Sequence, residues 1–430
     1  MHKMKRIFFT LLIFFLAVFQ IKAQLTLELC QELAKENYPA IKKYGLLEKS
    51  LEIDLSDINK SWLPSISLYG QGTIQNITPS FPNALQDVLA QMGQEIKGLG
   101  KLQYKVGVDF SQPIWDGGAS KAKRDLARSQ DEMQKASLEV ELYSLRQKVE
   151  NIFFAILLTE EQINQSQLTL ELLNSNLSLL ESMYKNGTAM RSDIDMVKAQ
   201  VLTLKQNITQ AESGVASYRK LLSIYIGKDI SSKTLITPKA SMPNSLNSER
   251  PELQLFESRI QTSGSSRNLI NVSLMPKIGL FAQAYYGYPG FDYFKSMMNR
   301  DLSFNILAGV KASWNIDSFY TKKNKLNHID LEISNIEIER EIFLFNSNLQ
   351  TEKDLEAIEG LKKVMEDDEE IIVLRQNVRK AAESQLRNGI IDATALLSKI
   401  TDENIARLTA KLHEIQYIQQ IYKLKNTLNQ

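Results

Sequence analysis

The sequence predicts a mostly α-helical chain with a small membrane β part, built as two copies of one unit. Three observations lead to this fold class: two matching blocks of sequence, stretches without glycine or proline that are too long for globular helices, and four short segments with period-2 alternation. The 430 residues are 43% hydrophobic and 23% charged, as in ordinary folded protein.

Residues 1–23 are predicted to be a signal peptide. A basic start precedes an apolar run from Ile7 to Phe19, and Ala23 is a small residue suited to cleavage before Gln24. The run has 13 residues, whereas a spanning helix needs roughly 20. Without this segment acidic residues slightly outnumber basic ones, so the charge does not indicate nucleic acid binding. Cys30 is the only cysteine, so no intrachain disulfide can form, and we expect it to pack in a helix.

Two repeats follow, over 24–230 and 250–430, with a linker at 231–249 that we expect to pack against the outside of the helices. Pro39 and Pro64 in the first repeat match Pro251 and Pro276 in the second, both at an offset of 212. Gly107 and Gly309 then match at an offset of 202, so the difference falls in a loop between these blocks. Each repeat reads as helix, two strands, and a long helical hairpin.

The helical hairpins are predicted over 119–226 and 320–428. No glycine or proline interrupts residues 119–184, and this length of helix extends roughly 100 Å at the usual rise. After Ile194 the apolar residues recur at alternating spacings of three and four, which predicts coiled-coil packing. These residues are Val197, Val201, Leu204, Ile208, Ala211, Val215, Tyr218, Leu222 and Tyr225.

The four strands are predicted near 64–75, 102–114, 275–286 and 302–315. Their alternation fits a transmembrane barrel strand and also a soluble amphipathic sheet. The signal peptide and the long helices favour membrane-spanning strands. Four strands cannot close a barrel, whereas three chains would supply twelve strands. Long loops at 76–100 and 286–302 join the strands, and we expect a short helix over 83–98. The predicted lipid-facing residues are Tyr104, Val106, Val108, Phe110, Phe304, Ile306 and Val310.

Each hairpin turns at an Asn-Gly pair, Asn186-Gly187 and Asn388-Gly389. Both residues tolerate positive φ, so the pair closes one helix, and Ser192 or Thr394 is expected to cap the next. A plain hairpin turn accounts for this pattern, but a turn at the end of a long hairpin is also available to a partner.

Catalytic, cofactor-binding and metal-ligating sets are not predicted. The sequence has no GxxxxGK[ST], GxSxG or HExxH motif, and its histidines have no metal-ligand spacing. The acidic run at 366–370 is interpreted as a solvated helix face. We therefore expect neither an enzyme nor a cofactor, and any energy for transport must come from a partner.

The chain resembles TolC-like outer membrane efflux proteins over essentially the whole mature length. The resemblance rests on the ordered set LTLELCQELAKENYPAIKK, LPSISLYG, VDFSQPIWDGGASKAKRD and YKNGTAMRSDIDMVKAQ. It implies a homotrimer with a twelve-stranded barrel in the outer membrane of a Gram-negative bacterium and a helical tunnel across the periplasm. It also implies partners: a periplasmic adaptor (membrane fusion protein) and an inner-membrane pump of RND or ABC type.

The resemblance assigns roles to particular residues. It places the strand-to-helix junction at Pro113, Asp116, Gly117 and Gly118, which Phe319 and Tyr320 replace in part in the second repeat. At the second turn Ala395 and Ser398 stand where the family commonly has acidic residues. The implied periplasmic tip, with adaptor docking and gate, comprises Asn186, Gly187, Thr188, Ser192, Asp193, Asp195, Asn388, Gly389, Ile390 and Asp392.

The function implied is an outer membrane channel of a tripartite efflux or type I secretion system that conducts substrate passively. The alternative is a periplasmic coiled-coil scaffold or adaptor without a pore, in which the strands form a soluble sheet. Adaptors usually carry one hairpin beside a compact β domain, whereas this sequence has two matched hairpins.

Overall fold

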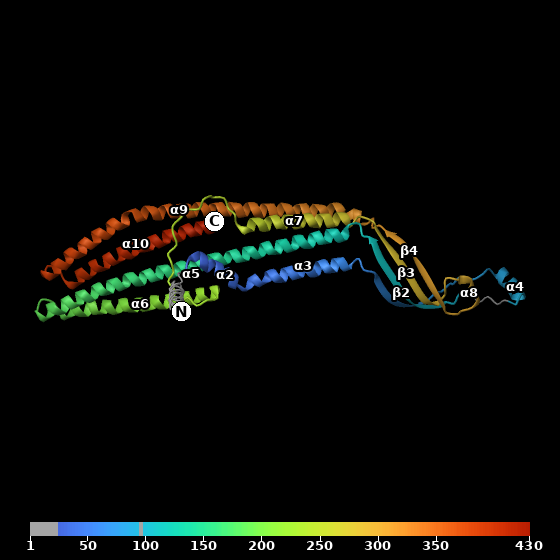
Figure 1. Cartoon of the computed structure of the whole chain (residues 1–430), viewed down its shortest axis with the longest axis horizontal. Coiled ribbons are helices and arrows are strands. Elements are labelled where there is room, and N and C mark those ends of the chain that lie inside the picture. Colours follow the sequence, from blue (N-terminus) through green and yellow to red (C-terminus); the bar gives the residue numbers. More distant parts are fainter. Residues whose placement is uncertain (1–24, 94–97) are drawn as a thin grey trace, which may run out of the picture. The chain divides into compact units, whose positions relative to one another are not determined.

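The computed structural model describes residues 25–93 and 98–430 (Figure 1). The predicted signal peptide and residues 94–97 of the predicted 83–98 helix lie outside the described residues. The elements are, in chain order, α2 (Leu27–Asn37), η2 (Pro39–Lys42), α3 (Lys43–Lys60), β1 (Ser65–Ile74), α4 (Asn83–Gln91), β2 (Leu102–Trp115), α5 (Ala119–Lys185), α6 (Arg191–Ile226), α7 (Pro251–Val272), β3 (Lys277–Tyr288), α8 (Tyr293–Met298), β4 (Ser303–Ser313), α9 (Ser318–Arg387) and α10 (Ala393–Leu428).

The chain divides into two compact units that cut across both sequence repeats. Of the described residues, unit 1 contains 25–44, 136–255 and 339–430, and unit 2 contains 45–93, 98–135 and 256–338. Helices α5 and α9 contribute residues to both units. Unit 1 therefore holds the two helical turns, and unit 2 holds the sheet.

Helix α6 follows the predicted seam at every second apolar position. Five of its seven buried residues recur with a seven-residue period from Ile194 to Leu222, whereas Leu204, Tyr218 and Tyr225 are only partly buried or exposed. A strict heptad stripe packs along one line of a partner helix, so the intervening positions lie at its margin. The buried residues are Ile194, Val197, Val201, Ile208, Val215, Leu222 and Ile226.

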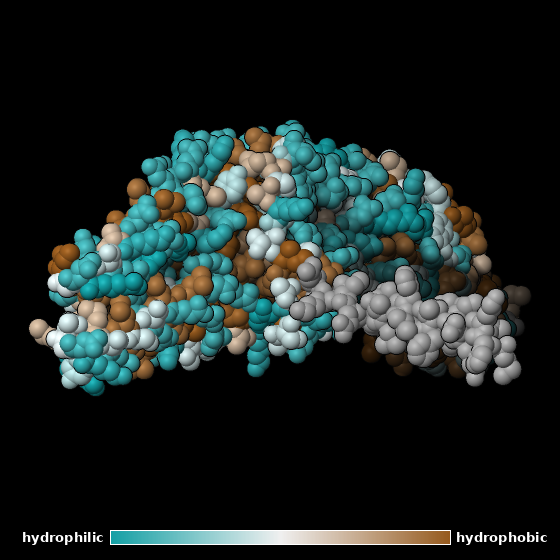
Figure 2. Space-filling view, turned by 60° about the vertical axis from the view of Figure 1, so that its left-hand side comes forward, coloured by the Kyte–Doolittle hydropathy of each residue, from teal (hydrophilic) through white to brown (hydrophobic). Residues whose placement is uncertain are grey.

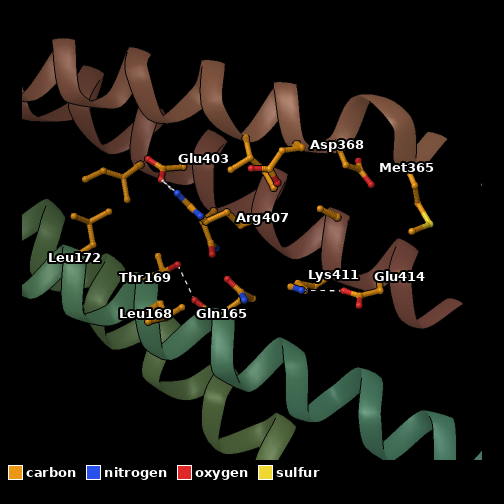
Figure 3. A pocket seen from close by; sticks show the side chains of 15 residues that line it. Gln165, Leu168, Thr169, Leu172, Met365, Asp368, Glu403, Arg407, Lys411 and Glu414 are labelled. Atoms are coloured by element: carbon orange, nitrogen blue, oxygen red, sulfur yellow. Dashed lines mark hydrogen bonds and ion pairs between the residues drawn. The ribbon is translucent and has the colours of Figure 1, made fainter. Parts of the chain in front are cut away.

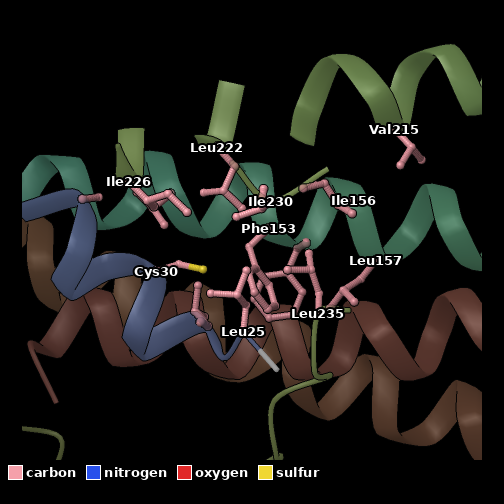
Figure 4. Close-up of a cluster of buried hydrophobic side chains, with 14 of the residues drawn as sticks. Leu25, Cys30, Phe153, Ile156, Leu157, Val215, Leu222, Ile226, Ile230 and Leu235 are labelled. Carbon is pink, nitrogen blue, oxygen red and sulfur yellow. The ribbon is translucent and has the colours of Figure 1, made fainter. Parts of the chain in front are cut away.

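The main core of unit 1 forms where α2, α5, α6 and α10 meet (Figure 4). Phe153 and Phe154 are fully buried there, and Leu235 from the linker packs into the same core. Leu235 thus holds the linker against the helices, because an apolar side chain gains more from burial than from water. The outside position of the linker stays a prediction. Cys30 packs in this core as predicted, and burial, followed by the charge of Glu28, raises the pKa of its thiol to about 11.

Unit 2 is built on one antiparallel sheet with the strand order β1-β2-β3-β4. Each strand pairs with the next along the chain, and β2 pairs with β3 across the two repeats. Strands β1 and β4 are therefore the free edges. The predicted fold class, mostly helical with four strands, is confirmed.

None of the described helices carries an apolar stretch long enough to cross a bilayer. On the side drawn in Figure 2, apolar residues interrupt the hydrophilic surface in many places. Helix α9 exposes several large ones within unit 1: Ile342, Phe345, Leu349, Ile371, Leu374 and Val378.

Candidate functional site

The first helical turn has the hydrogen bonding of a Schellman motif. Gly187 has φ +76°, and the N–H of Thr188 donates to the carbonyl of Met183 over 2.9 Å. The Thr188 hydroxyl donates to the same carbonyl over 3.0 Å. No atom lies within 4 Å of the position a Cβ at Gly187 would take, so the glycine is required by its backbone conformation and not by space.

The second turn repeats this geometry. Gly389 has φ +68°, and the N–H of Ile390 donates to the carbonyl of Gln385 over 2.9 Å. The Asn388 side chain donates to the carbonyl of Ser384 over 2.9 Å, which satisfies one of the last carbonyls of α9. Ile390 is exposed, so an apolar side chain stands on the surface of this turn.

Aspartates, not hydroxyl residues, form the side-chain hydrogen bonds at the starts of the two helices that leave the turns: Asp392 is the N-cap of α10, and Asp193 lies in the first turn of α6, whose N-cap is Met190. The Asp193 carboxylate accepts from the N–H of Met190 over 2.9 Å, and the Asp392 carboxylate accepts from the N–H of Ala395 over 2.8 Å. The expected caps Ser192 and Thr394 are wrong. A carboxylate is the stronger acceptor at a helix N-terminus, where the helix dipole favours negative charge.

Buried apolar side chains next to the two turns of unit 1 hold the two hairpins together. A cluster beneath them joins residues from α5, α6, α9 and α10, and the Thr394 hydroxyl donates to the sulfur of Met196 on the other hairpin over 3.5 Å. Asp195 pairs with Arg191 at 3.3 Å on the surface. The buried members of the cluster are Leu173, Leu180, Ile194, Val197, Val201, Ala382, Leu386, Ala393, Leu396 and Ile400.

In unit 2 the strand register aligns all predicted lipid-facing residues on one face of the sheet. Val108 lies between Leu68 and Ala284, and Ala284 lies beside Ile306, so one row crosses all four strands. The face is apolar and open: Val106 is 69% exposed and Ile306 is 63% exposed. No charged residue of the four strands lies on this face.

The opposite face of the sheet is polar with aromatic side chains. The Lys105 ammonium lies over the rings of Tyr69 and Tyr285, at 5.7 and 5.2 Å from their centroids. The Gln283 amide donates to the carboxylate of Asp109 over 2.8 Å. The two faces therefore suit different surroundings, one apolar and one aqueous.

The strand-to-helix junction after β2 depends on residues that sequence analysis singled out. The Asp116 carboxylate accepts from the N–H of Gly118 over 2.9 Å and from the N–H of Ser120 over 2.6 Å, which caps α5. Burial raises the pKa of Asp116, but these hydrogen bonds more than offset it, so the pKa lies below its usual value. Gly117 has φ +73°, and a Cβ there would lie 2.6 Å from that of Met275. Pro113 stands at a register shift between β2 and β3, where a missing N–H is tolerated.

A groove of about 580 Å³ in unit 1 lies between α5 and the α9 and α10 pair (Figure 3). Its charged side chains are already paired: Arg407 with Glu403 at 2.9 Å, and Lys411 with Glu414 at 2.9 Å. These pairs leave the groove without a free charge from those four residues to attract a ligand. Within residues 25–93 and 98–430 no cluster of three metal-ligating side chains occurs.

Unit 1 also contains a buried polar cluster that the sequence does not predict. Glu150 of α5 is 2% exposed and accepts from the Asn426 amide, while Asp354 of α9 is fully buried. Asp354 accepts from Gln420 over 2.8 Å and pairs with Lys423 at 3.2 Å. The residues come from α5, α9 and α10, which are far apart in sequence, so no local pattern marks them.

Comparisons with known proteins agree with this geometry. Residues 32–227 match the family model described as outer membrane efflux protein. Solved structures with the same fold include the outer membrane protein VceC from Vibrio cholerae (12% identity, 94% of each chain covered, TM-score 0.66) and the CmeC channel of Campylobacter jejuni (13%, 94% of this chain and 85% of that one, 0.64). The open state of the Neisseria gonorrhoeae MtrE channel is another (14%, 94% and 88%, 0.64).

No curated protein matches the sequence. The family match spans the first repeat and its hairpin, and the shared fold covers nearly the whole chain. CmeC and MtrE are outer membrane channels. The chain is therefore similar to the outer membrane efflux protein family over residues 32–227, and it shares the fold of solved outer membrane channels over most of its length.

Proposed function

We propose that three copies of this chain form an outer membrane channel of a tripartite efflux or type I secretion system. The observation that carries this function is the sheet of unit 2: one face is mostly apolar, largely exposed and without a charged residue, the other is polar, and both edges are free. In lipid an unpaired backbone group costs several kcal/mol, so strands β1 and β4 must pair with other copies. Three copies supply twelve strands, which suffice for a barrel with a water-filled interior.

The helical turns of unit 1 are the proposed periplasmic tip. Their backbone is fixed by the two Schellman motifs, while Met190 and Ile390 are about 70% exposed and stand free on the surface. A rigid turn with exposed apolar side chains is suited to docking a periplasmic adaptor. The ten predicted tip residues therefore stay proposed as the docking edge and gate.

Passage through this channel is passive. The chain has no nucleotide-binding motif, and we propose that it catalyses no reaction and carries no cofactor. The direction of transport then comes from an inner-membrane pump of RND or ABC type that the adaptor connects to the tip.

Fractionation and conductance test this function together. The channel predicts heat-modifiable trimers that are extracted from the outer membrane only with detergent, and stepwise conductance when they are added to planar bilayers. A scaffold without a pore would be released with the soluble periplasm and would give no conductance. Because an adaptor also binds pumps, capture of a pump alone does not distinguish the two.

A further inference from the structure

A cavity of about 370 Å³ lies in unit 2 at the end of the sheet where the strands meet the junction. Side chains from β2, β3, β4 and the first turns of α5 line it. Its strand residues include Ser111, Lys277 and Lys311, which share the face of Lys105 and Asp109. The cavity therefore opens on the polar side of the sheet, opposite the apolar face.

Three lysines line this cavity: Lys277 of β3, Lys311 of β4 and Lys123 of α5. All three are exposed, and none forms an ion pair with another residue in the described part of the chain. Strands β3 and β4 place Lys311 opposite Gly279, two residues from Lys277, so the two ammonium groups leave neighbouring strands on the same side. Unpaired lysines held close together cost energy through repulsion, which an anion relieves.

Asp116 is the one carboxylate among the described residues that line the cavity, and it is engaged elsewhere. Its two oxygens accept from the N–H groups of Gly118 and Ser120 at the start of α5. The three lysines therefore outweigh the one carboxylate, and the cavity carries net positive charge. The hydroxyl of Ser313 adds a neutral hydrogen-bond donor.

We propose that Lys123, Lys277 and Lys311 form an anion-selecting cluster at the junction end of the channel lumen, which favours small solutes that bear carboxylate, phosphate or sulfate groups. This proposal rests on the proposed trimer, because only the closed barrel turns the polar face into a lumen with three such clusters around it. Fixed charges act over about one Debye length, roughly 10 Å at 0.1 M salt, so the preference is strongest in dilute electrolyte.

The test is the reversal potential of the purified trimer in a planar bilayer under a KCl gradient. Wild-type channels are expected to pass chloride in preference to potassium. The triple variant Lys123→Gln, Lys277→Gln, Lys311→Gln should lower the chloride-to-potassium permeability ratio by about twofold or more, because three positive charges per copy leave the lumen. The triple Lys→Arg variant keeps the charge and should keep the wild-type ratio.

Lys121→Gln is the matched control, since Lys121 is an exposed lysine on the same turn of α5 that does not line the cavity. It should leave the ratio unchanged. Conducting wild-type channels that prefer potassium, or a triple glutamine variant with the wild-type ratio, would overturn the anion cluster and leave the channel intact. A trimer that never conducts would overturn the proposed function and this inference with it.

Discussion

The surroundings of Glu150 strongly shift the pKa of its carboxyl group. Burial is the largest influence and raises the pKa of its carboxyl to about 8, although Arg146, the Asn426 amide and Lys423 oppose the shift. The negative charge of Asp354 on α9 raises the pKa of Glu150 further. The folded chain therefore holds a proton at Glu150 in a pH range where the unfolded chain has released it.

Stability should fall as pH rises through the window between the ordinary carboxyl pKa of 4.5 and about 8. Glu150→Gln mimics the protonated acid, so the stability of this variant should not fall as pH rises. Above about pH 8 its free energy of unfolding should exceed that of the wild type by on the order of 1–4 kcal/mol. Thermal unfolding of the detergent-solubilised protein at about pH 5 and about pH 9 measures the difference.

Asp354→Asn is the control for this prediction. Asp354 pairs with Lys423, so its removal leaves a lysine without its partner and should destabilise the chain at both pH values. If Glu150→Gln lowers the unfolding temperature equally at both values, the protonated state of Glu150 in the folded chain is refuted.

Among the helices, the two turns are the elements on which the proposed adaptor docking depends. Gly187→Val places a β-branched residue at φ +76°, at a cost of about 1–2 kcal/mol, and should shift the turn backbone. We expect normal trimer levels with impaired pump coupling, seen as raised sensitivity to toxic substrates in cells. Gly214→Val is the control, because Gly214 lies inside α6 with no atom within 4 Å of an added Cβ. Unchanged sensitivity in cells with normal trimer levels would contradict the docking role of the turn.

Substitutions on the two faces of the sheet test whether its apolar face contacts lipid or belongs to a soluble sheet. Leu68 and Ser67 are neighbours on β1 that point to opposite faces, and Leu68 is 81% exposed in the single chain. Leu68→Arg should cost about 2–4 kcal/mol if that face meets the bilayer midplane, and should reduce the folded trimer in the outer membrane. Ser67→Arg, on the polar side beside Asp109, should be tolerated. Equal trimer levels for both variants, measured by heat modifiability, would favour a soluble sheet.

The sequence predicts each strand end to within two residues, because alternation and turn residues are local signals. It did not predict the interruption at η2, where Pro39 starts a short 3-10 helix between α2 and α3. It also missed the aspartate caps, because several polar residues near each turn fit the same pattern. Burial of Glu150 and Leu235 depends on segments brought together only by folding, so the sequence carried no signal for either.

For the whole molecule, the single chain is an incomplete structure. The sheet of unit 2 has two free edges and an open apolar face, and α9 exposes a series of large apolar residues in unit 1. Both features place hydrophobic or hydrogen-bonding surface in water, which folded chains avoid unless a partner or lipid covers it. The proposed homotrimer in the outer membrane accounts for both features.

Electron cryo-microscopy of the detergent-solubilised oligomer tests the central claim most directly. The account predicts three copies in which β4 of each copy is hydrogen-bonded to β1 of the next, giving one closed barrel of twelve strands with the apolar face toward detergent and Lys105 toward the lumen. A monomer, or an oligomer in which β1 and β4 stay unpaired and the apolar face of the sheet packs inside the protein, would contradict it.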